Sequence, residues 1–121
     1  DKYRNRPNEV AEMRVIGNVE GKDVLLVDDI IDTGGTLSKA ADIIMSQGAS
    51  SVRAICTHGI LSGKAYDIIE NSALEKLVVT DTVPAKQESS KIEVLSVAQM
   101  FATCIKKTHK YESINSLFIQ I

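Results

Sequence analysis

The feature that most constrains the fold is an unbroken apolar run, Val24 to Val27, followed at once by a polar segment rich in Asp, Thr and Gly. A continuous apolar run of this length is typical of a strand buried on both faces of a parallel sheet. After the polar segment, apolar residues recur at helical spacing from Leu37 to Met45, and Gly48 ends that pattern. This region therefore predicts a buried strand, a short loop and a helix in succession.

The same alternation of apolar runs and amphipathic segments continues along the chain. Helical spacing predicts a short helix over residues 66–70 and a longer helix after Ser96, a candidate N-cap. Strands that alternate with helices predict an α/β fold with a doubly wound, mostly parallel sheet and flanking helices. In such sheets, ligands bind beyond the carboxyl ends of the strands. The predicted strands are residues 10–17, 24–27, 51–57, 76–80 and 92–95, with a turn at 20–22.

The composition fits one modest globular domain and narrows the possible functions. The chain has 121 residues, 44% of them hydrophobic, and 14 basic against 16 acidic residues give a net charge of −2. The near-neutral charge and the 4% aromatic content argue against a nucleic-acid partner, and no apolar run is long enough to cross a membrane. Cys56 and Cys104 lie far apart in apolar stretches, which predicts two buried thiols and favours a reducing, cytoplasmic location.

The polar segment, residues 28–36, has the composition of a phosphate-binding turn. Its glycines let the backbone direct amide groups inward, its threonines add hydroxyl groups, and the following helix contributes the N–H groups of its N-terminus. Two adjacent carboxylates just upstream suit sugar hydroxyl groups or a hydrated Mg²⁺. A plain helix N-cap is the alternative, but a cap needs only one Ser, Thr or Asp. The residues concerned are Asp28, Asp29, Asp32, Thr33, Gly34, Gly35 and Thr36.

This segment resembles the phosphoribosyl-diphosphate-binding motif of the type I phosphoribosyltransferase fold. The resemblance implies that Asp28 and Asp29 contact ribose hydroxyl groups and, through water or substrate, a Mg²⁺ ion. It also implies that residues 32–36 form the loop that holds the 5-phosphate.

The flanking segments resemble a narrower family, the ribose-phosphate pyrophosphokinases, along nearly the whole chain. The resemblance implies the Mg²⁺-dependent conversion of ATP and ribose 5-phosphate to AMP and phosphoribosyl diphosphate by a homo-oligomer. Lys2 and Arg4 match the cations of the family's mobile catalytic loop, although Tyr3 departs from the basic residue usual there. A solvated basic terminus is the alternative for these cations. The matching segments are residues 1–4, 6–10, 15–22, 57–58, 61–63, 78–82, 113–114 and 117–118.

The resemblance also implies how the chain is organised. Residues 1–9 correspond to a remnant of the mobile loop. Residues 10–111 correspond to the C-terminal part of a phosphoribosyltransferase-like domain that is incomplete at its N-terminus, and residues 112–121 to a tail. Because the family's ATP site draws on residues outside this piece, we expect the chain to supply the ribose 5-phosphate half-site and to be inactive alone.

Two features of the resemblance leave alternatives open. In the family the tail contributes to a regulatory nucleotide pocket between subunits, which Ser113, Asn115 and Phe118 match, although Asn115 stands where serine is common. A tail that packs on its own domain is equally consistent with the sequence.

The phosphate motif is shared with phosphoribosyltransferases that consume phosphoribosyl diphosphate, and a non-catalytic regulatory relative would also keep it. The intact acidic pair counts against the regulatory relative, whereas Tyr3 favours it.

Overall fold

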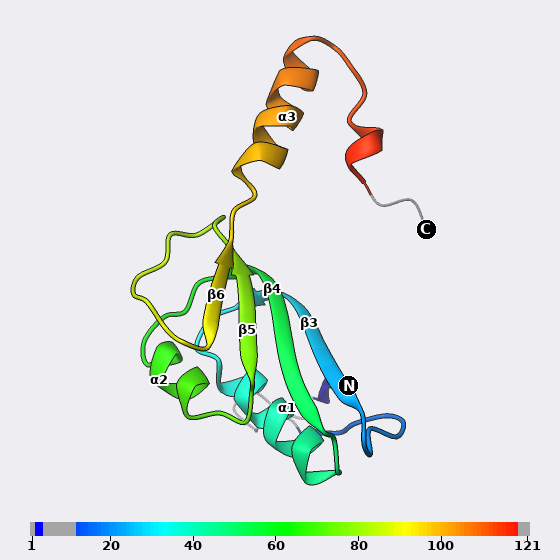
Figure 1. Ribbon diagram of the computed structural model, residues 1–121, viewed down its shortest axis with the longest axis vertical. Helices are drawn as coiled ribbons and strands as arrows, with labels where there is room; N and C mark the ends of the chain where they lie inside the picture. The colour runs from blue at the N-terminus through cyan, green and yellow to red at the C-terminus, as the bar shows by residue number, and fades with distance from the viewer. Residues whose placement is uncertain (1, 4–11, 119–121) are drawn as a thin grey trace.

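The structure is a computed structural model that describes residues 2–3 and 12–118 of the chain. Its strands and helices follow one another mainly in the predicted order (Figure 1). The strands are β1 (Lys2–Tyr3), β2 (Glu12–Met13), β3 (Asp23–Ile31), β4 (Ser51–Gly59), β5 (Lys76–Thr80) and β6 (Ile92–Leu95). The helices are α1 (Gly35–Ser46), α2 (Ala65–Glu70), α3 (Ala98–His109) and a short 3-10 helix, η1 (Asn115–Leu117).

Four strands form one parallel sheet in the order β3-β4-β5-β6. Val27 of β3 pairs with Ile55 of β4, Ile55 with Val78 of β5, and Val78 with Glu93 of β6. Because the strands are parallel, all four carboxyl ends lie at the same edge of the sheet. The predicted α/β fold with a parallel sheet and flanking helices is confirmed.

A hydrophobic core lies between one face of this sheet and the helices α1 and α2. Helix α1 buries Leu37, Ala41 and Ile44, whose spacing places them along one side of the helix. Helix α2 buries Ala65, Tyr66 and Ile69 in the same core. The sheet contributes alternate residues of its strands, which point to one face. These are Val52, Ala54 and Cys56 of β4 with Leu77 and Val79 of β5.

The opposite face of the sheet is open over much of β3. Leu25 and Val27 are 54% and 72% exposed, whereas their neighbours Val24 and Leu26 pack against the core. Ile55 on β4 is also among the exposed apolar residues. The prediction that this strand is buried on both faces is wrong, because within residues 12–118 both helices that pack on the sheet do so from the core side.

Helix α3 continues from the carboxyl end of β6 and projects away from the sheet (Figure 1). The helix begins at Ala98 with Val97 as its N-cap residue, so the predicted N-cap, Ser96, lies one residue too early. The Ser96 hydroxyl accepts a hydrogen bond from Ala98 N–H at 3.2 Å. The predicted apolar stripe is present but no residue of α3 is buried. Its exposed large side chains are Met100, Phe101 and Ile105.

The N-terminal region forms a separate ribbon. Strand β1 pairs antiparallel with β2, with Lys2 opposite Met13. The prediction of a strand over residues 10–17 is wrong in extent, because residues 14–17 are irregular and residues 10 and 11 lie outside the described part of the chain. The predicted turn at residues 20–22 is confirmed by a hydrogen bond from Lys22 N–H to Val19 O at 3.0 Å. Within the described residues, the helices are too short or too polar to cross a membrane.

Candidate functional site

The acidic pair lies within β3 rather than after it. The strand continues through Asp28 and Asp29 to Ile31, because its backbone pairs with β4 as far as Gly59. Both carboxylates are exposed, and Asp29 N–H donates a hydrogen bond to Asp28 Oδ1 at 2.8 Å. The strand therefore ends later than predicted, but both carboxylates still lie near the carboxyl edge of the sheet.

A tight turn at Gly34 leads the chain from β3 into α1. Gly34 adopts the left-handed conformation, with φ of 78°, and a Cβ atom built there would lie 3.2 Å from Cγ1 of Ile69 on α2. A side chain would be strained at this φ, and Ile69 would have to shift to make room for it. No side chain caps α1, and Ser38 N–H donates to Gly34 O at 2.9 Å. The N–H groups at the start of α1, together with the positive end of the helix dipole, suit an anion.

The loop after β4 lies against this turn. The N–H groups of Ile60 and Leu61 donate to Ile31 O at 2.9 and 3.3 Å, and Ser62 N–H donates to Asp32 O at 3.0 Å. The Ser62 hydroxyl also donates to the carboxylate of Asp32. Sequence reasoning missed Ser62 as part of the site, because no local pattern connects it to a residue 30 positions away.

A cluster of hydroxyl groups lies where β4 and β5 end. His58 Nδ1 lies 2.8 Å from Thr82 Oγ1, and that hydroxyl also donates to Thr57 O at 3.1 Å. Thr80 Oγ1 donates to the same carbonyl at 2.7 Å. These threonines were not predicted as site residues, and the signal that could have found them is their position near the carboxyl end of a strand of a parallel sheet.

Two groups near this edge have shifted pKa values. Burial raises the pKa of the Cys56 thiol, which keeps it neutral beside the carbonyl oxygen of His58 at 3.3 Å. Hydrogen bonds from the Ser96 side chain and from Val97 N–H, the latter at 2.8 Å, lower the pKa of Asp81. Both cysteines are free; Cys56 is buried as predicted, whereas Cys104 is half-buried.

The remaining predicted residues belong to the two ends of the chain. Lys2 belongs to β1, and Arg4, with most of the predicted mobile loop, lies outside the described residues. Ser113, Asn115 and Phe118 follow α3 in the chain, and the described segment after α3 lies well away from the sheet (Figure 1). Ser113 Oγ accepts a hydrogen bond from Asn115 N–H at 3.2 Å, and the Phe118 side chain is exposed. The described tail therefore does not pack on the sheet.

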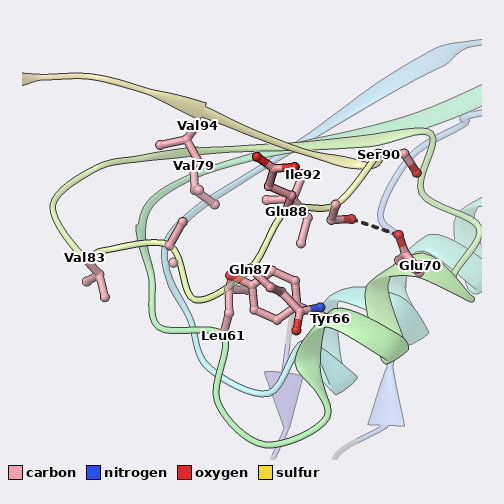
Figure 2. A pocket seen from close by; sticks show the side chains of 13 residues that line it. Leu61, Tyr66, Glu70, Val79, Val83, Gln87, Glu88, Ser90, Ile92 and Val94 are labelled. Atoms are coloured by element: carbon pink, nitrogen blue, oxygen red, sulfur yellow. Dashed lines mark hydrogen bonds between the residues drawn. The ribbon is translucent and has the colours of Figure 1, made fainter.

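Several cavities open among the described residues of the domain, and two of them are compared with the site. The smaller, about 230 Å³, lies at the acidic end of the sheet, and its lining includes Asp28, Thr57, Thr80 and Leu95. The larger, about 530 Å³, lies between α2 and the loop that joins β5 to β6, and none of the predicted site residues lines it (Figure 2). Among the described residues, no group of three or more His, Cys, Asp or Glu could hold a metal by itself.

Both the sequence and the fold of this chain are similar to those of known proteins. Residues 3–119 match the family model of the phosphoribosyl synthetase-associated domain. The ribose-phosphate pyrophosphokinases of Wolinella succinogenes and Campylobacter jejuni are 54% and 53% identical to the chain over 98% of its length. The chain spans only 38% of each of these relatives.

A solved structure supports the same relationship. The crystal structure of phosphoribosylpyrophosphate synthetase from Mycobacterium smegmatis matches with a TM-score of 0.79 and 35% sequence identity, covering 81% of this chain and 34% of that chain. Since the family model covers nearly the whole chain and the fold agrees as well, the chain belongs to the ribose-phosphate pyrophosphokinase family.

Proposed function

We propose that this chain supplies the ribose 5-phosphate half-site of an enzyme that transfers a diphosphoryl group from ATP to ribose 5-phosphate. One observation carries the proposal. The exposed pair Asp28 and Asp29 stands at the carboxyl end of β3, directly before the Gly34 turn and the uncapped N-terminus of α1. The names of the curated relatives support this substrate and this reaction.

The turn and the helix N-terminus bind the 5-phosphate. Backbone N–H groups at the start of α1 point along the helix axis, and the partial positive charge of the helix N-terminus favours an anion. The exposed side chains of Thr33 and Thr36 flank these amides and can add hydroxyl donors. The left-handed Gly34 keeps the turn compact enough to form this cradle.

The acidic pair binds the ribose. The carboxylate oxygens of Asp28 and Asp29 accept hydrogen bonds, and the hydroxyl groups of a sugar donate them. The pair also fits a hydrated Mg²⁺, because that ion is usually held by one or two carboxylates together with water and substrate phosphates. When bound, Mg²⁺ neutralises negative charge on the phosphates. With one Asp28 oxygen accepting the Asp29 amide, the remaining carboxylate oxygens are the ones available to these ligands.

The transfer forms and breaks one bond each at phosphorus. The C1 hydroxyl oxygen of ribose 5-phosphate bonds to the β-phosphorus of ATP, the bond from that phosphorus to the oxygen bridging the α-phosphorus breaks, and AMP leaves while the hydroxyl proton is released. Such transfers depend mainly on positioning and charge neutralisation. Lys2 and Arg4 are proposed to stabilise the charge that develops on the transferred group.

The chain is proposed to act as part of a larger cytoplasmic homo-oligomer. It spans 38% of its curated relatives, so residues outside it would supply the adenine site. The tail residues Ser113, Asn115 and Phe118 are proposed to contribute to a regulatory nucleotide pocket with a neighbouring subunit, since the described segment after α3 does not pack on the sheet (Figure 1).

Phosphorus NMR of the purified chain with Mg²⁺, ATP and ribose 5-phosphate tests the proposal. We expect the ribose 5-phosphate resonance to shift and no AMP to form. Thr36→Ala should weaken the binding about tenfold through loss of a hydroxyl donor to a charged group. Thr103→Ala is the matched control, because that hydroxyl donates to Gln99 O on α3, outside the site.

The outcomes separate the possible functions. A folded chain that leaves the ribose 5-phosphate resonance unmoved contradicts the phosphate site, and AMP formation by the chain alone contradicts the half-site. In a full-length parent, replacement of Lys2 and Arg4 by Ala should abolish most AMP formation without abolishing ribose 5-phosphate binding. A parent that instead needs a nucleobase and phosphoribosyl diphosphate would be a phosphoribosyltransferase.

A further inference from the structure

Residues 32–36, between β3 and α1, form the turn that is proposed to hold the phosphate, here called the phosphate turn. A compact set of hydrogen bonds joins this turn and the end of β3 to the loop after β4. Ile31 O accepts from Ile60 N–H and Leu61 N–H, and Asp32 O accepts from Ser62 N–H. A fourth bond, from the Ser62 hydroxyl to Asp32 Oδ1, involves side chains on both sides. The loop after β4 therefore holds the end of β3 through the backbone of Ile31 and Asp32 and through the side chain of Asp32.

The donor loop is itself held in place. Leu61 has a positive φ of 51°, which is uncommon for a residue with a side chain, and it is only 3% exposed. Its carbonyl oxygen lies 3.4 Å from Lys86 Nζ, and Ser62 O accepts from Ala65 N–H at the start of α2 at 3.1 Å. A backbone conformation of this kind persists only where its surroundings determine it. Ser62 thus has a defined position from which to hold Asp32.

The charge of Asp32 explains why its orientation matters. Asp32 precedes the turn that would hold a phosphate dianion, and a carboxylate facing a dianion repels it. A carboxylate that accepts a hydroxyl hydrogen bond has a preferred rotamer, whereas an exposed carboxylate without that bond samples several. The side chain of Asp32 is exposed apart from its contact with Ser62, so no burial holds it.

We propose that Ser62 is a positioning residue for the phosphate site: its hydroxyl holds the Asp32 carboxylate against the loop after β4, away from the bound phosphate. The inference rests on the proposed function and deepens it, because it assigns Asp32 an anchoring role within the phosphate turn. Ser62 does not touch the ligand in this arrangement. It acts through Asp32 and through the backbone of the turn.

Titration of the chain with ribose 5-phosphate, followed by phosphorus NMR, tests the inference. Ser62→Ala should raise the dissociation constant about tenfold, as expected for loss of one hydrogen bond to a charged group. Ser62→Thr keeps the hydroxyl and should restore most of the affinity. Ser46→Ala is the matched control, because its hydroxyl donates to Ile43 O at the far end of α1 and should leave binding unchanged.

A double-mutant cycle with Asp32→Asn separates positioning from a general loss of structure. If Ser62 acts by directing the charge of Asp32, the effect of Ser62→Ala should shrink to less than twofold when residue 32 carries no charge. The inference would be overturned if Ser62→Ala weakened binding equally with Asp32 and with Asp32→Asn. It would also be overturned if the Ser62→Ala variant bound ribose 5-phosphate as tightly as the chain without substitutions. Amide spectra of each variant confirm that it is folded.

The same titration distinguishes failure of the inference from failure of the proposed function. If the folded chain without substitutions does not bind ribose 5-phosphate, the proposed function is overturned, and the inference with it. If that chain binds and the Ser62→Ala variant binds with equal affinity, only the inference is overturned.

Discussion

The two faces of the sheet are built by the same strands but contribute differently to the protein. On the closed face, Leu77 is completely buried among residues of α1, α2 and β4. On the open face, Leu25 is 54% exposed, and its pairing partner Arg53 has an exposed side chain. The apolar character of a strand residue therefore does not show whether it stabilises this fold; the presence of a helix over it does.

The candidate site combines residues that depend on this difference. The Gly34 turn packs on Ile69 of the closed side, so the core fixes its shape. The acidic pair lies on an exposed stretch of β3, where ligands have access. A rigid turn beside accessible carboxylates is the arrangement that ligand binding requires.

The largest expected difference between the faces comes from truncating one leucine on each. Leu77→Ala should lower the free energy of unfolding by about 2–5 kcal/mol, because it leaves a cavity in the closed core. Leu25→Ala should lower it by about 0.5 kcal/mol or less, because its side chain is already half in water. Chemical denaturation of both variants checks the comparison, and equal losses would show that the open face is covered in solution.

A second comparison concerns two left-handed glycines. Gly34→Ala should destabilise the chain by roughly 2 kcal/mol, because both φ and the contact with Ile69 oppose a Cβ atom. Gly63→Ala should cost about 1 kcal/mol, since its φ is 58° but no atom lies within 4 Å of the added Cβ. Thermal unfolding measures both. Equal costs would mean that Ile69 yields to the new methyl group.

The connection between the sheet and α3 should depend on pH. The pKa of Asp81 is lowered in the folded chain by hydrogen bonds from the Ser96 side chain and from Val97 N–H. Its contribution is thus present above the ordinary pKa of 3.8 and is lost as the pH falls through the lower, folded value. The Val97 amide resonance should report this titration with a midpoint below pH 3.8. Asp81→Asn should abolish it, and a midpoint at or above 3.8 would contradict the prediction.

The smallest expected effect is on the open face itself. Arg53 Nε lies 3.0 Å from Glu75 Oε2, with both side chains more than half exposed. Solvent screening limits such a pair to about 0.5 kcal/mol. Arg53→Ala should therefore change the midpoint of denaturation only slightly, and this change should be even smaller at high salt. A loss comparable with that of Leu77→Ala would show that the arginine has a further role on this face.

Much of the central sheet could be read from local patterns. The apolar runs located β4, β5 and β6 to within two residues at their ends, and glycine at position 48 marked the end of the helical pattern at α1. The acidic pair and the glycine-rich turn into α1 were also recognisable, because their residues lie close together in the chain. Local hydrogen bonding and periodicity are sufficient to produce such signals.

The incorrect predictions concern features that depend on contacts between residues distant in the sequence. The extension of β3 through Asp28 and Asp29 depends on pairing with β4. The exposure of Leu25 and Val27 depends on which face of the sheet α1 and α2 cover, and an amphipathic pattern does not specify the surface on which a helix packs. The extent of the strand near Met13 depends on its partner, β1.

By itself, the sequence determined the order of most strands and helices, the position of the turn at Gly34 and the family to which the chain belongs, because each is encoded in residues close together in the chain. Only the tertiary structure decided which face of the sheet is covered, how far β3 extends and that Ser62 holds Asp32. These features require hydrogen bonds and packing between residues far apart in the chain, and no local pattern specifies such partners.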